Sequence, residues 1–251
     1  MPEAILLKLG GSVLTRKSSE GEIMYEQLER IGEEIGTRRG IPLAIVHGAG
    51  SCGHPEAKRY DLTGGLSRKN LEGVQVTHQA VSRLNTELVV ALRRHGREAI
   101  GIHPLHAGYA ENGRLVSMEC RQIQEMIARS MVPVLHGDVV MDGMKGVSII
   151  SGDQLVVYLA RVLRFGRIGL ATDVPGVLDG DRVIPVITAS SAGTIPIRVS
   201  RHTDVTGGME GKVRELLDLA REGTSSVIFH IDRLGDFLDG KPTGGTVVRG
   251  G

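Results

Sequence analysis

The sequence predicts an α/β fold in which a mainly parallel central sheet is sandwiched between helices. Short apolar runs of strand length alternate along the chain with longer segments of helical periodicity. This alternation is typical of parallel strands joined by helical crossovers, which cover both faces of the sheet. The 251 residues contain no internal repeat and no low-complexity linker, so we expect a single domain.

The first part of the chain supplies four predicted strands and three predicted helices. Residues 4–9 (AILLKL) and 43–47 (LAIVH) are apolar throughout most of their length, as buried strands are. Residues 27–38 repeat their apolar side chains with helical spacing, so these three segments predict a βαβ unit. The other expected elements are strands at residues 99–102 and 132–135 and helices at residues 70–94 and 119–128.

The second part begins with a predicted hairpin over residues 139–150, whose two short apolar runs flank Asp142-Gly143. The remaining expected elements are helices at residues 152–163 and 209–221, strands at residues 168–171 and 226–231, and an edge strand at residues 246–249. Segment 187–205 shows no clear period and receives no assignment.

Composition and short motifs exclude several classes of function. A net charge of +1 creates no field that would attract nucleic acid or a membrane surface. Aromatic residues make up only 3% of the chain, which disfavours a base-stacking surface. The longest apolar runs are far shorter than a membrane span, and Pro2-Glu3 does not resemble the start of a signal peptide. Two cysteines without a metal or disulfide pattern favour a reducing cytoplasm.

Two glycine clusters directly follow predicted strands and are candidate anion sites. In residues 8–12 (KLGGS), glycine amides can approach an anion closely, and Lys8 adds a positive charge. Residues 48–54 (GAGSCGH) offer a second set of amides followed by His54. This segment formally matches a dinucleotide-binding motif, but Glu72, near the expected distance, begins a helical segment instead of ending a strand. A dehydrogenase is therefore disfavoured.

A third cluster, residues 204–212 (DVTGGMEGK), places paired glycines before a helix whose first turns carry Lys212. It is no Walker A loop, because Thr206 and Val213 occupy positions where that motif needs glycine and Ser or Thr. Asp153 begins a predicted helix, and Asp173 follows a predicted strand. The other histidines are mostly scattered along the sequence, and no metal-binding or serine-hydrolase motif occurs.

Five segments in this order resemble the amino-acid-kinase superfamily: KLGGS, GAGSCGH, SGDQ, TDVPGV and DVTGGMEGK. The resemblance extends from Lys8 to Lys212. Within that superfamily, His54 and the tripeptide His136-Gly137-Asp138 are similar to those of the isopentenyl phosphate kinases, while the fosfomycin kinases also carry a histidine after this glycine cluster.

The resemblance implies the amino-acid-kinase fold and ATP-dependent phosphorylation of isopentenyl phosphate to isopentenyl diphosphate by direct in-line transfer. It implies catalytic roles for Lys8, Lys17, His54, Asp153 and Lys212. It implies that the acceptor is bound by Ala49, Gly50, Gly53, His54 and Gly152. It implies that the nucleotide is bound by Lys8, Gly10, Gly11, Ser12, Gly50, Thr172, Asp173, Gly207, Gly208 and Lys212.

The resemblance also implies an acceptor-binding half over about residues 1–150 and a nucleotide-binding half over about residues 151–251. Magnesium would be carried on the ATP phosphates without a protein cage. A cytoplasmic homodimer that acts in isoprenoid biosynthesis by the mevalonate pathway, with no nucleic-acid or membrane partner, completes this expectation.

Alternative functions remain at this stage. One is a different kinase of the superfamily, either of the fosfomycin type or with a nucleotide, carbamate or carboxylate acceptor. The other is a non-catalytic protein that binds nucleotides or oxyanions. The presence of Lys8, Lys17, Asp153 and Lys212 together favours turnover. A phosphate monoester is already anionic near neutral pH, so this acceptor needs cationic groups more than a general base.

Overall fold

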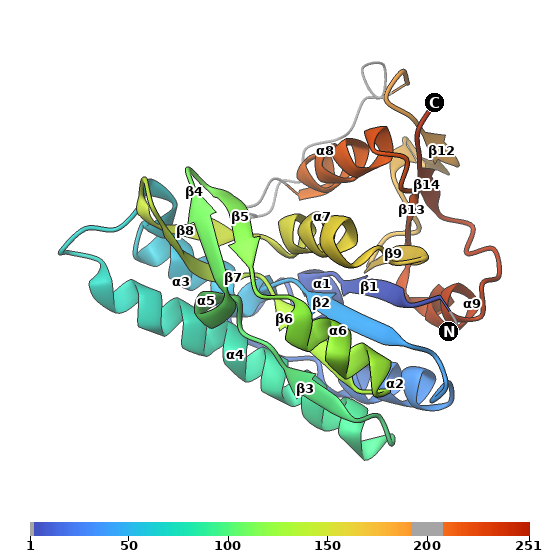
Figure 1. Ribbon diagram of the computed structural model, residues 1–251, viewed down its shortest axis with the longest axis horizontal. Coiled ribbons are helices and arrows are strands. Elements are labelled where there is room, and N and C mark those ends of the chain that lie inside the picture. The colour runs from blue at the N-terminus through green and yellow to red at the C-terminus, as the bar shows by residue number, and fades with distance from the viewer. Residues whose placement is uncertain (1–2, 192–207) are drawn as a thin grey trace.

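An eight-stranded sheet forms the centre of the computed structural model, which describes residues 3–191 and 208–251 (Figure 1). In spatial order the strands are β12 (Val186–Ile187), β14 (Thr246–Val248), β13 (Ser226–His230), β9 (Arg167–Thr172), β1 (Ile5–Leu9), β2 (Leu43–His47), β6 (Val132–His136) and β3 (Ala99–Gly101). From β13 to β3 every neighbouring pair is parallel, whereas β14 runs antiparallel to β13.

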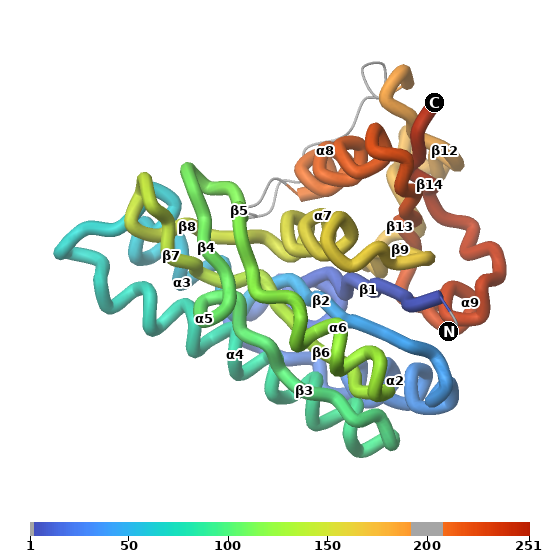
Figure 2. The backbone as a smooth tube through the Cα atoms, viewed as in Figure 1, coloured from blue at the N-terminus to red at the C-terminus, as the bar shows by residue number. Residues whose placement is uncertain are grey.

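Helices cover both faces of this sheet, which confirms the predicted α/β sandwich (Figure 1). One face carries α6 (Arg121–Ala128), α7 (Gly152–Leu163) and α8 (Gly208–Arg221). The other carries α1 (Gly11–Leu14), α2 (Tyr25–Gly36), α4 (Leu71–Arg94) and α9 (Leu234–Leu238). Figure 2 shows α4 running along the side of the sheet opposite to α7 and α8.

The central strands read as continuous apolar runs because both of their faces are buried. Leu6 belongs to the core layer beneath α6, α7 and α8, whereas Ile5 and Leu7 belong to the layer beneath α2 and α4. Side chains alternate across a strand, so Lys8 lies on the same face as Leu6 and points toward α7. This alternation decides which polar groups can meet at the ends of the strands.

A smaller sheet lies beside α4, with the order β5 (Arg114–Met118), β4 (Gly108–Glu111), β7 (Asp138–Asp142) and β8 (Gly146–Ile150). The predicted hairpin over residues 139–150 is confirmed as β7 and β8. The hairpin of β4 and β5 was missed, although Asn112-Gly113 at its tip is a strong turn signal. Both residues have positive φ angles, of 49° and 86°, as such a turn requires.

The remaining elements are short: α3 (Gly50–Arg59), η1 (Leu62–Gly64), α5 (Pro104–Ala107), β10 (Leu178–Asp179), β11 (Arg182–Val183) and η3 (Ile231–Arg233). All the helices and strands expected from the sequence lie within two residues of their predicted bounds. The prediction of an edge strand at residues 246–249 is wrong in one respect, because β12 pairs with β14 on its outer side. With only two residues, β12 gives no recognisable apolar run.

Among residues 3–191 and 208–251, no helix is both long and apolar enough to cross a bilayer.

Asp142 joins the two hairpin tips of the smaller sheet. Its buried carboxylate accepts hydrogen bonds from the backbone amides of Asn112, Gly113, Met144 and Lys145 and from the hydroxyl of Ser148. Burial opposes ionisation, but these donors outweigh it and hold the pKa of the Asp142 carboxyl well below its usual range. The carboxylate therefore fixes the hairpin that leads into α7.

We expect Asp142→Ala to lower the free energy of unfolding by about 2–4 kcal/mol, because several buried amides lose a charged acceptor. The folded-state pKa lies below the unfolded one, so this stabilisation is present above about pH 4 and is lost as the pH falls through the folded value. Urea unfolding at pH 7 and at pH 3 would measure both effects. Asp181→Ala, which removes an exposed carboxylate from a turn, is the matched control. Equal stability of wild type and Asp142→Ala at pH 7 would contradict the assignment.

Candidate active site

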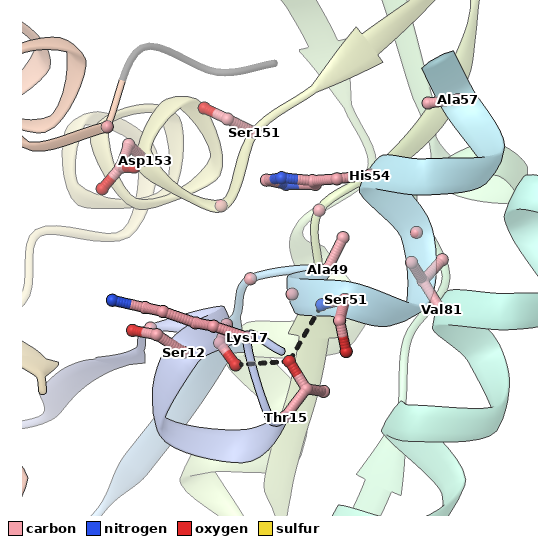
Figure 3. Close-up of a pocket in the computed structure, with 18 of the residues that line it drawn as sticks. Ser12, Thr15, Lys17, Ala49, Ser51, His54, Ala57, Val81, Ser151 and Asp153 are labelled. Carbon is pink, nitrogen blue, oxygen red and sulfur yellow. Dashed lines mark hydrogen bonds between the residues drawn. The ribbon is translucent and has the colours of Figure 1, made fainter. Parts of the chain in front are cut away.

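A cavity of about 480 Å³ opens at the carboxyl ends of the central strands. Its walls are formed by short segments that follow β1, β2, β6 and β9, together with the starts of α7 and α8. Ligands of open α/β sheets bind at this edge, because connections there leave in opposite directions and open a crevice. Figure 3 shows part of the lining, including Ser12, Lys17, His54 and Asp153.

The first two glycine clusters pack directly against each other. A Cβ atom at Gly11 would lie 2.4 Å from the nitrogen of Gly50, which itself has a φ of +55°. Thr15 bridges the clusters: its hydroxyl donates to the Gly11 carbonyl and accepts from the Ser51 amide, each at 2.9 Å (Figure 3). Only glycine allows this approach, which brings the amides of both clusters to one cavity.

Helices α3 and α7 both begin at the cavity wall. The sequence predicted a glycine loop at residues 48–53, but from Gly50 onward this segment is already the first turn of α3. In the part of the chain that the structure describes, no acceptor pairs with the amides of Ala49, Gly50, Gly152 or Asp153. Unpaired amides at the positive end of a helix dipole favour an anion.

The buried carboxylate of Asp153 holds two ammonium groups. Lys8 Nζ lies 2.8 Å from Asp153 Oδ1, and Lys212 Nζ lies 3.3 Å from the same oxygen. Lys8 comes from the α7 face of β1, Asp153 from the first turn of α7, and Lys212 from α8. The three side chains are at most 10% exposed. The structure therefore brings together three of the residues that the sequence predicted to be catalytic.

This ion triad, Lys8, Asp153 and Lys212, has a positive balance. Burial lowers the pKa of the Lys8 ammonium to about 8, although the nearby Asp153 carboxylate opposes the shift. Burial also opposes ionisation of Asp153, but Lys212 and Lys8 outweigh it and lower the pKa of the Asp153 carboxyl to about 2. Two ammonium groups and one carboxylate leave about one unit of positive charge, which an incoming phosphate would neutralise.

Lys17 lies on the same cavity but does not join the triad. Its Nζ contacts Asp173 Oδ2 at 2.6 Å, and Ser12 Oγ donates to Asp173 Oδ1 at 2.7 Å. Burial opposes ionisation of Asp173, but the hydrogen bonds from Lys17 and Ser12 lower its carboxyl pKa. Thr172 donates its hydroxyl to the Val174 carbonyl at 2.7 Å and so fixes the turn that presents Asp173.

The last of the predicted residues lie on α3 and α8. The ring of His54 extends from α3 into the cavity (Figure 3). Gly53 lets α3 approach α4, because a Cβ atom there would lie 2.4 Å from Val81. Gly10 and Gly208 also line the cavity, whereas Gly207 lies outside the described residues.

Cys52 points away from the cavity. The side chain is buried in the core layer beneath α2 and α4 and is absent from the cavity lining. Burial raises the pKa of the Cys52 thiol, so it is no activated nucleophile.

One end of the cavity is mainly apolar. Ala57 from α3 and Val81 from α4 lie on the same side of the cavity as His54 (Figure 3), and Ile149 from β8 adds to the apolar lining. The buried hydroxyl of Thr77 also faces this region and has no hydrogen-bond partner within the described chain. The cavity thus combines cationic and amide groups at its centre with apolar surface beyond His54.

The other histidines are scattered along the sequence but not in space. Five of them form a network of ring contacts beside the cavity: His47, His78, His103, His106 and His136. The histidines meet because β2 and β6 pair in register and because α4 packs beside them. No single motif in the sequence shows these contacts. The repeated dipeptide His-Gly at the ends of two strands was the available signal. Over residues 3–191 and 208–251, no group of His, Cys, Asp and Glu has the arrangement of a metal site.

Comparison with known proteins finds that residues 3–230 match the Amino acid kinase family. The chain is 40% identical to the isopentenyl phosphate kinase of Haloferax volcanii, with 98% of each chain covered. It is 38% identical to that of Methanothermobacter thermautotrophicus, covering 98% of this chain and 99% of the relative. A solved structure of an isopentenyl phosphate kinase superposes with a TM-score of 0.86 at 35% identity, covering 98% of this chain and 99% of that one.

Sulfate binding should report the charge of the triad, because sulfate keeps its own charge between pH 6 and pH 9. We expect its affinity to fall as the pH rises through about 8, where Lys8 loses its proton. Lys8→Met keeps the volume of the side chain without its charge and should abolish this stepwise fall in sulfate affinity. Lys17→Met is the matched control and should retain it. Calorimetric titration would measure both, and a step of equal size in Lys8→Met would disprove the role of Lys8.

Proposed function

Because this chain belongs to the amino acid kinase family, we propose that it transfers the γ-phosphoryl group of ATP to isopentenyl phosphate, which yields isopentenyl diphosphate and ADP. The observation that carries this proposal is one cavity that joins a buried cationic triad, unpaired amides and an apolar end. Two phosphates must approach each other during the reaction, and the apolar end fits a short prenyl chain. The identity to isopentenyl phosphate kinases supports the same acceptor.

The acceptor phosphate would lie against the start of α3. The amides of Ala49 and Gly50 and the ring of His54 are its proposed donors, together with the Gly152 backbone, which also lines the cavity. Gly53 allows α3 to pack closely enough on α4 for this arrangement. The five-carbon chain would then run along the apolar end of the cavity.

ATP would occupy the other side of the cavity. Gly10, Gly11 and Ser12 would wrap its phosphates, and Thr172, Asp173 and Gly208 would bind the nucleotide, with Gly50 between the two substrates. Gly207 belongs to the same proposal. Magnesium, held mainly by the ATP phosphates, would neutralise charge on the β- and γ-phosphoryl groups. The Asp173 carboxylate and the Ser12 hydroxyl lie at the cavity wall. Their oxygens are ligands suited to that ion or to its water shell.

In the proposed reaction an acceptor oxygen attacks the γ-phosphorus in line with the bond to ADP. The oxygen is already anionic, so no side chain needs to remove a proton. Lys8 and Lys212 would stabilise the charge on the transferring group, and Asp153 would position both ammonium groups. Lys17 would add positive charge after leaving Asp173, to which it is bound in this structure.

We further propose that residues 1–150 mainly bind the acceptor, that residues 151–251 mainly bind the nucleotide, and that a cytoplasmic homodimer acts in isoprenoid biosynthesis by the mevalonate pathway. The division between the halves is not strict, because Lys8 and residues 10–12 belong to the nucleotide side. Only the sequence resemblance supports the dimer, and light scattering of the purified protein would test it.

An acceptor screen tests the proposed function. ADP release should be fastest with isopentenyl phosphate when it is compared with dimethylallyl phosphate, fosfomycin, UMP, glutamate and carbamate. Lys212→Ala, measured in parallel, should lower turnover by about a thousandfold through loss of transition-state charge stabilisation. This variant also reveals any contaminating kinase. Faster turnover of glutamate or UMP than of isopentenyl phosphate would overturn the proposal.

His54 should affect the acceptor more than ATP. A hydrogen bond to a charged group contributes about 1.5–3 kcal/mol, so His54→Ala should reduce kcat/KM for isopentenyl phosphate about tenfold to a hundredfold. His54→Gln can keep one donor and should fall between Ala and wild type. ATP affinity, measured by calorimetry, should stay nearly constant. A collapse of ATP affinity would instead place His54 in the nucleotide site.

A further inference from the structure

Two neighbouring strands end in the same dipeptide at the same level of the sheet. His47 at the end of β2 pairs in register with His136 at the end of β6, and a glycine follows each. Both histidines are fully buried, and their rings stack with centroids 5.5 Å apart and an interplanar angle of 29°. Their side chains lie on the α4 face of the sheet, opposite to Lys8.

Each ring makes the same bond to the backbone that follows it. His47 Nδ1 lies 3.0 Å from the carbonyl oxygen of Gly48, and His136 Nδ1 lies 3.1 Å from that of Gly137. A carbonyl oxygen can only accept a hydrogen bond, so each Nδ1 must carry the proton and donate it.

The second nitrogen of the His47 ring faces a donor, the Asn85 amide, which fixes the tautomer of His47 from the other side. Asn85 Nδ2 lies 3.2 Å from His47 Nε2 and also donates to the Val134 carbonyl at 3.1 Å. Exchanging the nitrogen and oxygen of this amide would place its oxygen against the carbonyl oxygen of Val134, so Nδ2 is the atom that faces His47. His103 Nδ1 lies 2.9 Å from His136 Nε2. Burial lowers the pKa of His47 to about 4 and that of His136 to about 3, which keeps both rings neutral.

The two glycines lie where the segments of the cavity meet. A Cβ atom at Gly48 would lie 2.8 Å from the Gly11 nitrogen, and one at Gly137 would lie 3.2 Å from the Gly152 nitrogen. The Gly137 amide also donates to the His47 carbonyl at 2.9 Å. Each histidine therefore controls a peptide that touches another glycine segment of the site.

Peptide geometry connects the rings to the anion site. In a trans peptide the carbonyl and the following N–H point in opposite directions. Because His47 draws the Gly48 carbonyl toward the α4 face, the Ala49 N–H is turned toward the opposite face, where Lys8 and Asp153 lie. Within the described chain this amide has no acceptor. A reversed peptide would present a carbonyl oxygen to the bound phosphate and repel it.

We propose that His47 and His136 are positioning residues, whose Nδ1–H groups hold the Gly48 and Gly137 carbonyls away from the bound acceptor phosphate. The inference rests on the proposed acceptor site and adds two residues to it that do not contact the substrate. The two rings act as neutral donors and contribute no charge to the site.

Matched substitutions separate the Nδ1 donor from simple packing. Asn places an amide nitrogen close to the position of Nδ1, whereas Leu fills a similar volume without a donor. We expect His47→Leu to weaken binding of isopentenyl phosphate and of inorganic phosphate on the order of tenfold or more, with ATP affinity within about threefold of wild type. His47→Asn should recover most of the loss, and the His136 pair should behave alike. His95→Leu, which removes a histidine at the far end of α4, is the control.

Amide shifts of ¹⁵N-labelled protein during the phosphate titrations give a readout that needs no turnover. The Ala49 amide should respond strongly in wild type and in His47→Asn, but weakly in His47→Leu. Equal affinities in the Leu and Asn variants would overturn the inference. If wild type binds phosphate in this way but transfers no phosphoryl group to isopentenyl phosphate, the proposed function fails and the positioning role stands.

The tautomers can be tested even if the Leu variants do not fold. At pH 7 the ring ¹⁵N shifts of wild type should show a protonated Nδ1 and an unprotonated Nε2 for both His47 and His136. A protonated Nε2 on either ring would overturn the inference for that residue.

Discussion

The site depends on one carboxylate, Asp153, which two lysines share at the buried end of the sheet. Removing three charged groups from water is costly, and a buried ion pair alone is a weak source of stability. The triad is better explained as an anion-binding site, because it keeps a net positive charge where an anion can reach it. Lys8 must come from the α7 face of β1, and α7 and α8 must begin at the same level. The order of strands and helices around the triad meets these conditions.

Close approach of glycine backbones is the second constraint. Gly11 against Gly50 and Gly48 against Gly11 leave no room for a Cβ atom without movement of the backbone, and Gly137 against Gly152 leaves little. These contacts gather segments that are far apart in the sequence around one anion site. The same approach leaves amides without partners among the described residues, a cost that a bound phosphate would offset. The abundance of glycine in the sequence thus follows largely from the geometry of the cavity and from the tight turns elsewhere.

The sequence correctly predicted the helices and strands whose conformation is set by their own residues. Strands β1 and β2 are apolar on both faces and α4 has a long helical period, so their positions follow from the sequence alone. The residues of the ion triad were identifiable because each stands beside a glycine segment or at a helix start. The pairing of Lys17 with Asp173 was not, because it depends on how two distant turns meet. The histidine network was missed for the same reason: the contact of His47 with His136 arises from strand register, and that of His47 with Asn85 from the docking of α4.

The two faces of the sheet supply the site with different kinds of interaction. On the α7 face, charged groups lie around Asp153, and burial determines the strength of the electrostatic interactions between them. On the α4 face, neutral imidazoles make hydrogen bonds that set the direction of peptides. Protonated histidines there would add charge close to the triad, would lower the pKa of Lys8 further and would oppose the donor hydrogens of Asn85. Separation of the two roles lets the charge of the cavity be set by Lys8, Asp153 and Lys212, while the geometry of its amides stays constant across the pH range in which both rings are neutral.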